Sequence, residues 1–243
     1  MINKTNMYQH SVYQWNPFVG CKHQCVYCLS SFQAQIKRWA KKNCPECYKF
    51  EPHYRHLEDR LKQQLPRTKF MQFIFTCSNG DVAFCKTESL RKIVDRIRSE
   101  SSKTFLIQSK DPEKFNRLIF PDNVILGITL ETNRNKNYGK YSKAPIPSKR
   151  YGDFLAVKHP LKMVTVEPVM DFDLNVMVHW IKKINPCMVW IGYDSKSNKL
   201  PEPELLKVLE LHWQLSKAHI TTILKKISPP ADILPFSNKL TGG

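Results

Sequence analysis

Six short apolar runs recur along this chain, and polar or amphipathic stretches separate them. Most of the runs are nearly continuous in apolar residues, which is expected of parallel strands that are buried on both faces. They cover residues 70–76, 104–108, 124–130, 162–166, 188–192 and 220–224, and an earlier strand is expected at about 13–19. Alternation of strands and helices predicts a parallel sheet. Six or seven such units favour an open α/β barrel over a flat sheet.

Amphipathic helices are expected between these runs. Residues 87–100 place Leu90, Ile93, Val94 and Ile97 on one helical face, after a threonine suited to capping. Further helices are predicted over 111–117, 148–158, 174–184 and 202–216, and Asp173 is expected to cap the fourth of these five helices.

The length of 243 residues and the hydrophobic content of 42% are enough for one substantial core. We therefore expect a single domain over 1–243, with a Cys- and His-rich insertion at 43–61 and a basic loop at 133–150. No run of eighteen apolar residues occurs, and the first residues lack the apolar segment of a secretory signal. A cytoplasmic protein without a membrane partner is expected.

Eight cysteines in a chain of this kind favour metal binding or redox chemistry over disulfides. Cys21, Cys25 and Cys28 have the spacing C-x3-C-x2-C. A four-iron cubane normally takes four protein ligands, so three thiolates leave one iron open, and an open position is typical of a catalytic metal. Gly20 suits a tight turn at this loop. A zinc site, with a further ligand from Cys44 or Cys47, remains an alternative.

The cysteine loop, with Tyr27 before its last cysteine, resembles the signature of the radical S-adenosylmethionine (SAM) superfamily. The segments WNPFVGC, CPEC, LGITLET, TVEPVMDFD and VWIGYDS occur in this order. Over residues 15–226 they resemble a phage-type radical SAM family that is named after mycobacteriophage gene products. The cysteine loop alone also resembles that of spore photoproduct lyase.

This resemblance implies a partial (β/α)6 barrel with the Cys-rich insertion after the cluster loop. It also implies a [4Fe–4S] cluster on Cys21, Cys25 and Cys28 that passes an electron to SAM. The SAM then yields a 5′-deoxyadenosyl radical, which abstracts hydrogen from a substrate. The electron donor would be a protein such as flavodoxin or ferredoxin.

Chemistry in such barrels gathers where the strands end. After the second strand the superfamily usually has a Gly-Gly-Glu-like turn that touches the amino group of SAM. Ser78, Asn79, Gly80 and Asp81 take that place here, in a departure from the usual sequence, and an ordinary β-turn is the alternative. Tyr27 is expected to lie against the cofactor.

Three further side chains follow later strands and are candidate catalytic residues. Lys110 would face a carboxylate of SAM or a substrate phosphate, unless it is merely solvated. Glu131 would bind the ribose hydroxyls of SAM or act on protons, and Glu167 would act on protons, since a buried carboxylate can have a raised pKa.

Cys44 and Cys47 form a C-x2-C pair, which is typical of half a zinc site. His53 and His56 follow closely and would complete a Cys₂His₂ set. An auxiliary iron–sulfur cluster and free thiols are the alternatives.

The charge of the chain is strongly asymmetric. The net charge is +17, and residues 1–150 hold 27 Lys and Arg against 12 Asp and Glu. Within the loop at 133–150, six basic residues surround Tyr138 and Tyr141, a composition that suits phosphates and stacked bases. We therefore expect a radical SAM enzyme that acts on nucleic acid, in RNA modification or DNA repair. The alternatives are a radical SAM enzyme for a protein or small molecule, and a non-catalytic, zinc-containing nucleic-acid-binding protein.

Overall fold

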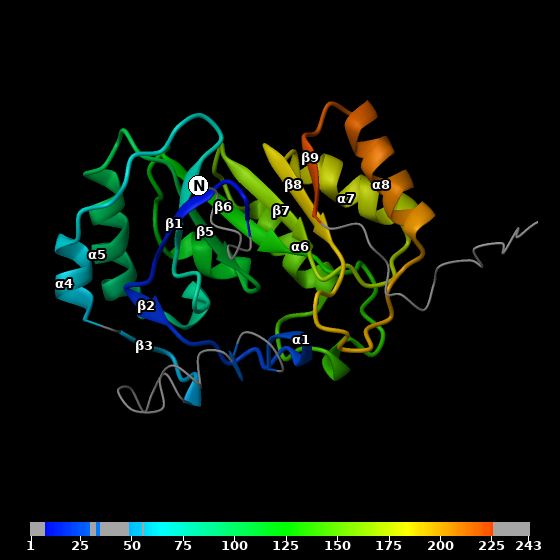
Figure 1. Cartoon of the computed structure of the whole chain (residues 1–243), viewed down its shortest axis with the longest axis horizontal. Coiled ribbons are helices and arrows are strands. Elements are labelled where there is room, and N and C mark those ends of the chain that lie inside the picture. Colours follow the sequence, from blue (N-terminus) through cyan, green and yellow to red (C-terminus); the bar gives the residue numbers. More distant parts are fainter. Residues whose placement is uncertain (1–7, 30–32, 35–48, 55, 226–243) are drawn as a thin grey trace, which may run out of the picture.

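A computed structural model describes residues 8–29, 33–34, 49–54 and 56–225. Its centre is a seven-stranded parallel sheet with the order β1-β4-β5-β6-β7-β8-β9. The strands are β1 Ser11–Trp15, β4 Phe73–Thr76, β5 Phe105–Ser109, β6 Val124–Thr129, β7 Lys162–Val166, β8 Met188–Gly192 and β9 Thr222–Lys225. Neighbours in the sheet follow one another along the chain, and the sheet curls into an open half-barrel (Figure 1). The predicted α/β partial barrel is confirmed.

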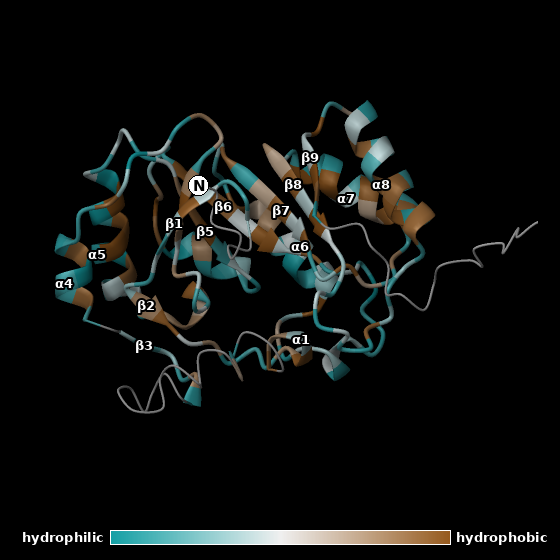
Figure 2. Ribbon diagram, in the orientation of Figure 1, coloured by the Kyte–Doolittle hydropathy of each residue, from teal (hydrophilic) through white to brown (hydrophobic). Residues whose placement is uncertain are grey.

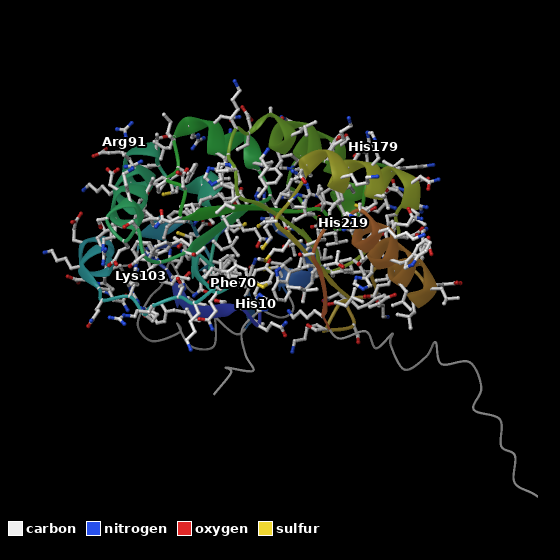
Figure 3. All side chains as sticks on the ribbon, turned by 90° about the horizontal axis from the view of Figure 1, so that it is seen from above. His10, Phe70, Arg91, Lys103, His179 and His219 are labelled. Atoms are coloured by element: carbon white, nitrogen blue, oxygen red, sulfur yellow. The ribbon has the colours of Figure 1, made fainter. Side chains whose placement is uncertain are left out.

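The longer helices cover the convex side of this sheet. The longer ones are α5 Thr87–Arg98, α6 Pro147–Ala156, α7 Leu174–Ile184 and α8 Leu205–Lys217, and the shorter ones are α1 Val26–Cys28 and α4 Leu57–Lys62. Short 3₁₀ helices are η2 Val82–Phe84, η3 Pro112–Arg117 and η4 Tyr138–Lys140. In the view from above, Arg91 on α5 and His179 on α7 lie on the helical side, away from His10 and Phe70 (Figure 3). Asp173 caps α7 as expected, because its side chain accepts a hydrogen bond from the Val176 N–H at 3.0 Å.

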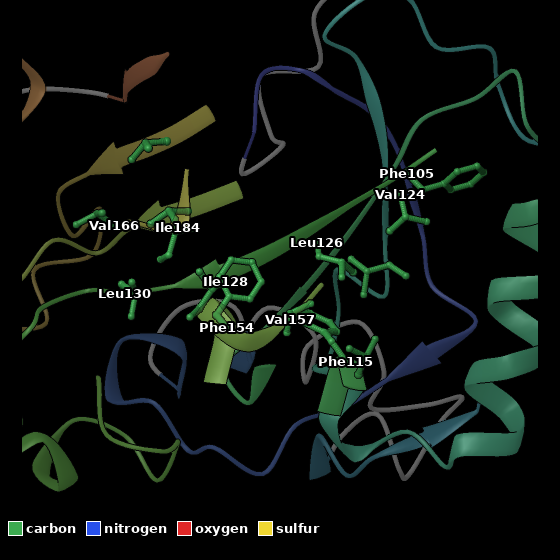
Figure 4. Close-up of a cluster of buried hydrophobic side chains, with 14 of the residues drawn as sticks. Phe105, Phe115, Val124, Leu126, Ile128, Leu130, Phe154, Val157, Val166 and Ile184 are labelled. Atoms are coloured by element: carbon green, nitrogen blue, oxygen red, sulfur yellow. The ribbon is translucent and has the colours of Figure 1, made fainter. Parts of the chain in front are cut away.

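The main core lies between the sheet and the helices. Ile128 on β6 lies beside Phe154 on α6, and Phe105, Val166 and Ile184 belong to the same cluster of buried side chains (Figure 4). Apolar colour accordingly follows the strands and one face of each long helix (Figure 2). Burial of such side chains stabilises the fold by about 1.5–3 kcal/mol each.

A smaller core fills the concave side of the sheet. Tyr8 is fully buried there, with its ring 5.0 Å from Trp190 and 5.9 Å from Phe73. Its hydroxyl donates to the Gln108 side chain at 2.5 Å and lies 2.9 Å from the Thr165 hydroxyl. Burial raises the pKa of Tyr8 far above its usual range. Tyr8 and its apolar neighbours therefore fill part of the concave side of the sheet. Polar side chains follow toward the carboxyl ends of the strands.

Two local expectations were wrong. The predicted first strand ends at Trp15, and a separate strand β2, Phe18–Val19, pairs antiparallel with β3, His53–Tyr54. The run at 70–76 forms a strand only from Phe73, since Phe70 is 94% exposed and Met71 has a φ of 62°. The helix predicted over 111–117 is present as the 3₁₀ helix η3, which begins at Pro112 as expected. In the part of the chain that the structure describes, no helix has the length and apolar character needed to span a bilayer.

Candidate active site

The cysteine loop follows β2 and is held by a close approach of two glycines. Gly20 has a φ of +92°, and a Cβ on it would lie 2.1 Å from the carbonyl oxygen of Glu51. A Cβ on Gly80 would lie 2.7 Å from the Gly20 oxygen. The Gly20 N–H donates to the Asn79 carbonyl at 3.0 Å, and the Asp81 N–H donates to the Gly20 carbonyl at 3.2 Å. Glycine is therefore required at both positions, and the turn after β4 fixes the start of the cysteine loop.

The three cysteines lie together at the edge where the strands end. Cys25 is buried, Cys21 and Cys28 are partly buried, and α1, which lies below the sheet in Figure 1, carries the last of them. Burial raises the pKa of the Cys28 thiol to about 11, and the neighbouring Cys25 adds to this effect. Cys77 and Cys85 belong instead to the core on the helical side. Burial also raises the pKa of the Cys21 thiol, and Cys25 again adds to the shift, so the three thiols are neighbours. Three neighbouring thiols suit a cubane cluster with one iron left open for a ligand.

Each of the three sulfurs has a polar neighbour. The His23 N–H lies 3.4 Å from the Cys21 sulfur, and the Gln33 side-chain amide donates to the Cys28 sulfur at 3.6 Å. The hydroxyl of Ser142 lies 3.1 Å from the Cys25 sulfur. Gln33 and Ser142 could not be predicted as neighbours of the cysteines, because nothing in their spacing along the chain connects them with these residues.

Asp81 joins the cysteine loop to the ends of β4 and β5. Its buried carboxylate lies 3.1 Å from His23 Nε2, and it accepts from the Ser109 hydroxyl at 2.6 Å. It also accepts from the backbone N–H groups of Ala83 and Lys110. Burial alone would raise the pKa of Asp81, but the hydrogen bond and charge of His23 lead the interactions that lower it. The predicted contact with the amino group of SAM would require Asp81 to give up one of these partners.

The rest of the predicted SAM-binding turn is tied to the end of β1. The Ser78 hydroxyl donates toward the side chains of Gln14 and Asn16, at 3.2 and 3.1 Å. The Asn79 N–H donates to the Asn16 side chain at 2.9 Å. These contacts hold the turn beside the cysteine loop, where the prediction placed it, and its contacts with a cofactor stay a prediction.

Glu131 is the centre of a buried charge cluster. It is fully buried, and Lys110, Tyr27 and Tyr138 all donate hydrogen bonds to its Oε1. Arg150, also fully buried, places Nη1 2.9 Å from Oε2 of Glu131. Burial opposes the charge on Glu131, but Arg150 and Lys110 outweigh burial and hold its pKa well below the usual range. Glu131 is therefore a fixed anion, which favours its predicted role as an acceptor over a role in proton transfer.

The structure brings three predicted site residues together in this cluster. The ammonium of Lys110 bonds both Glu131 and Tyr27, so it is not the solvated lysine that was one alternative. Charge on Cys25 and on Glu131 outweighs burial and raises the pKa of Lys110. Tyr27 thereby connects the cysteine loop to the ends of β5 and β6. Arg150 was missed as a partner, since its place in a basic segment suggested exposure.

Glu167 lies apart from this cluster, where β7 ends. Its Oε1 accepts from Lys225, at the end of β9, at 2.8 Å. Gly192 between them leaves room, because a Cβ there would lie 3.2 Å from the Glu167 carboxyl carbon. Burial raises the pKa of Glu167, although Lys225 opposes the shift. The second carboxylate oxygen, Oε2, is buried without a hydrogen-bond partner among the described residues, so it can accept from a ligand.

The segment at 133–150 differs from the exposed basic loop that was expected. Tyr138 and Arg150 are buried, so neither can stack on a base or bind a phosphate. Arg134 and Lys149 form ion pairs with Asp171 and Asp153. The exposed lysines of this segment that form no ion pair with any described residue are Lys136, Lys140 and Lys143.

Half of the predicted second metal site lies outside the described residues, since Cys44 and Cys47 are among the residues not described. His53 Nδ1 lies 2.7 Å from the Glu51 carbonyl, and the exposed His56 precedes α4 with a φ of 50°. No group of three clustered metal-ligand side chains in the described part of the chain includes either histidine. Zinc therefore stays a prediction.

Comparison with known proteins gives one family and a fold. The sequence model of a family described as a protein of unknown function (DUF5131) matches residues 5–185. No curated protein sequence matches the chain.

Two solved structures of spore photoproduct lyase have the same fold. A cysteine-to-alanine mutant with dinucleoside spore photoproduct has a TM-score of 0.63 at 11% identity, over 88% of this chain and 76% of that one. A tyrosine-to-phenylalanine mutant has a TM-score of 0.59 at 11% identity, over 90% and 77% of the two chains. The half-barrel thus has the fold of spore photoproduct lyase.

Proposed function

We propose that this chain, which belongs to the DUF5131 family of proteins of unknown function, is a radical SAM enzyme. The observation that carries the proposal is the position of three cysteines in the C-x3-C-x2-C spacing at the strand ends of a half-barrel of that fold. Cys21, Cys25 and Cys28 would hold a [4Fe–4S] cluster. When bound, the cluster supplies the electron that cleaves SAM into methionine and a 5′-deoxyadenosyl radical, which takes hydrogen from the substrate.

The residues of the chain perform the positioning in this proposal. Asp81 and the two glycines fix the cysteine loop against β4 and β5. Lys110 and Glu131, at the ends of β5 and β6, and Tyr27 on α1 form one hydrogen-bonded group that would orient SAM. Glu167 and Lys225 lie at the ends of β7 and β9, and the spare oxygen of Glu167 would accept a hydrogen bond from the substrate. The apolar plug around Tyr8 closes the base of the barrel to water.

A nucleic-acid substrate is the second part of the proposal. The net charge of +17 favours a polyanion, and Lys136, Lys140 and Lys143 are exposed in the segment that packs on the cysteine loop. Spore photoproduct lyase, a structural neighbour, was solved with a dinucleoside, which makes RNA and DNA the first substrates to test. We also propose that the chain is related to the phage-type radical SAM family that it resembles in sequence. A protein such as flavodoxin or ferredoxin would supply the electron.

The decisive experiment is anaerobic reconstitution with iron and sulfide, followed by dithionite and SAM. We expect a brown protein that forms 5′-deoxyadenosine, and the Cys25→Ala variant should form none. A wild-type protein that binds zinc, takes up no iron and leaves SAM intact would overturn the proposal. That result would favour the alternative, a non-catalytic, zinc-containing protein that binds nucleic acid.

A further inference from the structure

The segment that was expected to be a nucleic-acid-binding loop packs on the cysteine loop. Two backbone hydrogen bonds connect them, from the Val26 N–H to the Tyr141 carbonyl at 2.9 Å and from the Lys143 N–H to the His23 carbonyl at 2.6 Å. We refer to residues 138–144 as the strap. Ser142 lies between the two bonds and is 3% exposed. The strap thus covers the side of the cysteine loop at Cys25.

The Ser142 hydroxyl has three polar neighbours and one proton to donate. Its oxygen accepts from the Ala144 N–H at 3.0 Å. The proton can go to the His23 carbonyl, at 3.3 Å, or to the Cys25 sulfur, at 3.1 Å. The His23 carbonyl already accepts from the Lys143 N–H, so it keeps a partner whichever way the hydroxyl turns.

A sulfur that binds iron is a thiolate, which accepts hydrogen bonds and has no proton to donate. In the cluster-bound protein the hydroxyl of Ser142 therefore turns toward Cys25. The bond lies in a buried site, where a low effective dielectric strengthens hydrogen bonds to charged groups.

We propose that Ser142 is a positioning residue of the cluster, donating a hydrogen bond to the Cys25 thiolate and raising the reduction potential of the cluster. The inference rests on the proposed function, because it requires a cluster on Cys25. Reduction adds negative charge to the cluster and its sulfurs, so a donor at a ligand sulfur stabilises the reduced form more than the oxidised form.

The contact between the Ser142 hydroxyl and the Cys25 sulfur, at 3.1 Å, is the shortest of the three polar contacts described above for the cysteine sulfurs. The His23 N–H lies 3.4 Å from the Cys21 sulfur, and the Gln33 amide lies 3.6 Å from the Cys28 sulfur. Hydrogen bonds to charged groups are stronger than those between neutral groups. We expect loss of this bond to change the reduction equilibrium about tenfold, or ~59 mV for one electron.

The test compares the reduced fraction of the cluster at fixed potentials, by electron paramagnetic resonance, in wild type and Ser142→Ala. We expect equal iron content and an approximately tenfold smaller ratio of reduced to oxidised cluster in the variant. Ser142→Thr, which keeps the hydroxyl, should restore the wild-type ratio. Ser148→Ala is the matched control, because Ser148 lies outside the strap and bonds only Asn135 among the described residues.

Equal potentials in wild type and Ser142→Ala would overturn the inference while leaving the proposed function intact. If Ser142→Ala fails to hold iron, Ser142→Cys replaces it, since a thiol is a weaker donor than a hydroxyl. The potential of Ser142→Cys should then lie below that of Ser142→Thr, and equal potentials for these two variants would overturn the inference. Failure of the wild-type protein to form any cluster is a different result, and it would count against the proposed function.

Discussion

Glu131 is the residue on which the charge balance of the site depends. It is buried between Lys110 and Arg150, whose side chains are 15% and 0% exposed. Removal of one partner from a buried ion pair leaves an uncompensated charge, which typically destabilises a protein by about 3–5 kcal/mol. We expect Glu131→Gln to lower the free energy of unfolding of the cluster-free protein by about 3 kcal/mol, measured by urea denaturation at pH 7.

Acid should weaken this contribution of Glu131. The pKa of Glu131 is lower in the folded protein than its ordinary value of 4.5, so the stabilisation is complete above that value and is lost as the pH falls below it. The difference between wild type and Glu131→Gln should therefore shrink at acidic pH. Glu113→Gln is the control, because Glu113 is 54% exposed and its ion pair with Lys114 contributes little. Equal stability of Glu131→Gln and Glu113→Gln at pH 7 would contradict this account.

Among the elements, the cysteine loop depends most on the contact between Gly20 and Gly80. The positive φ of Gly20 and the 2.1 Å approach of the Glu51 oxygen leave no space for a methyl group. We expect Gly20→Ala to displace the loop, and iron bound after anaerobic reconstitution should fall to less than about a third of the wild-type amount.

Gly152→Ala is the matched control for this substitution. Gly152 lies in α6, and no atom lies within 4 Å of the position that its Cβ would take. Alanine is the better helix former, so this variant should gain about 0.5–1 kcal/mol of stability and keep its iron. A Gly20→Ala protein with wild-type iron content would show that the loop tolerates a different path.

The elements also show how far the sequence could predict this structure. The strands β7 and β8 and the helix α7 have the predicted bounds, because apolar periodicity reports burial directly. The same periodicity misled at Phe70, since a run of apolar residues does not show where a turn ends and a strand begins. At the site, the sequence could predict that the three cysteines lie on one loop near the ends of the strands. Ser142, Gln33 and Arg150 were not, because their contacts join segments that are distant along the chain.

On the scale of the whole molecule, the two ends of the half-barrel differ in the groups that they present. The strands end at the cysteine loop, the strap and the two carboxylates, while the helices α6 and α7 end at the opposite edge. Exposed lysines occur at both edges, so net charge alone does not say where a polyanion binds. Among the described residues, it is the end with the cysteine loop that places exposed lysines without an ion pair, Lys136, Lys140 and Lys143, beside the proposed chemistry.

This difference predicts where nucleic acid binds. Replacement of Lys136, Lys140 and Lys143 by alanine should weaken binding to single-stranded RNA or DNA and reduce the slope of log K against log salt by about 2–3, one counterion per lost contact. Replacement of Lys158, Lys182 and Lys183, three exposed lysines at the opposite edge, removes the same charge and should leave the slope nearly unchanged. Filter binding at several salt concentrations measures both slopes. Equal losses in the two triple variants would mean that the field of the whole protein attracts the polyanion, and absence of salt-dependent binding in the wild type would remove nucleic acid as the substrate.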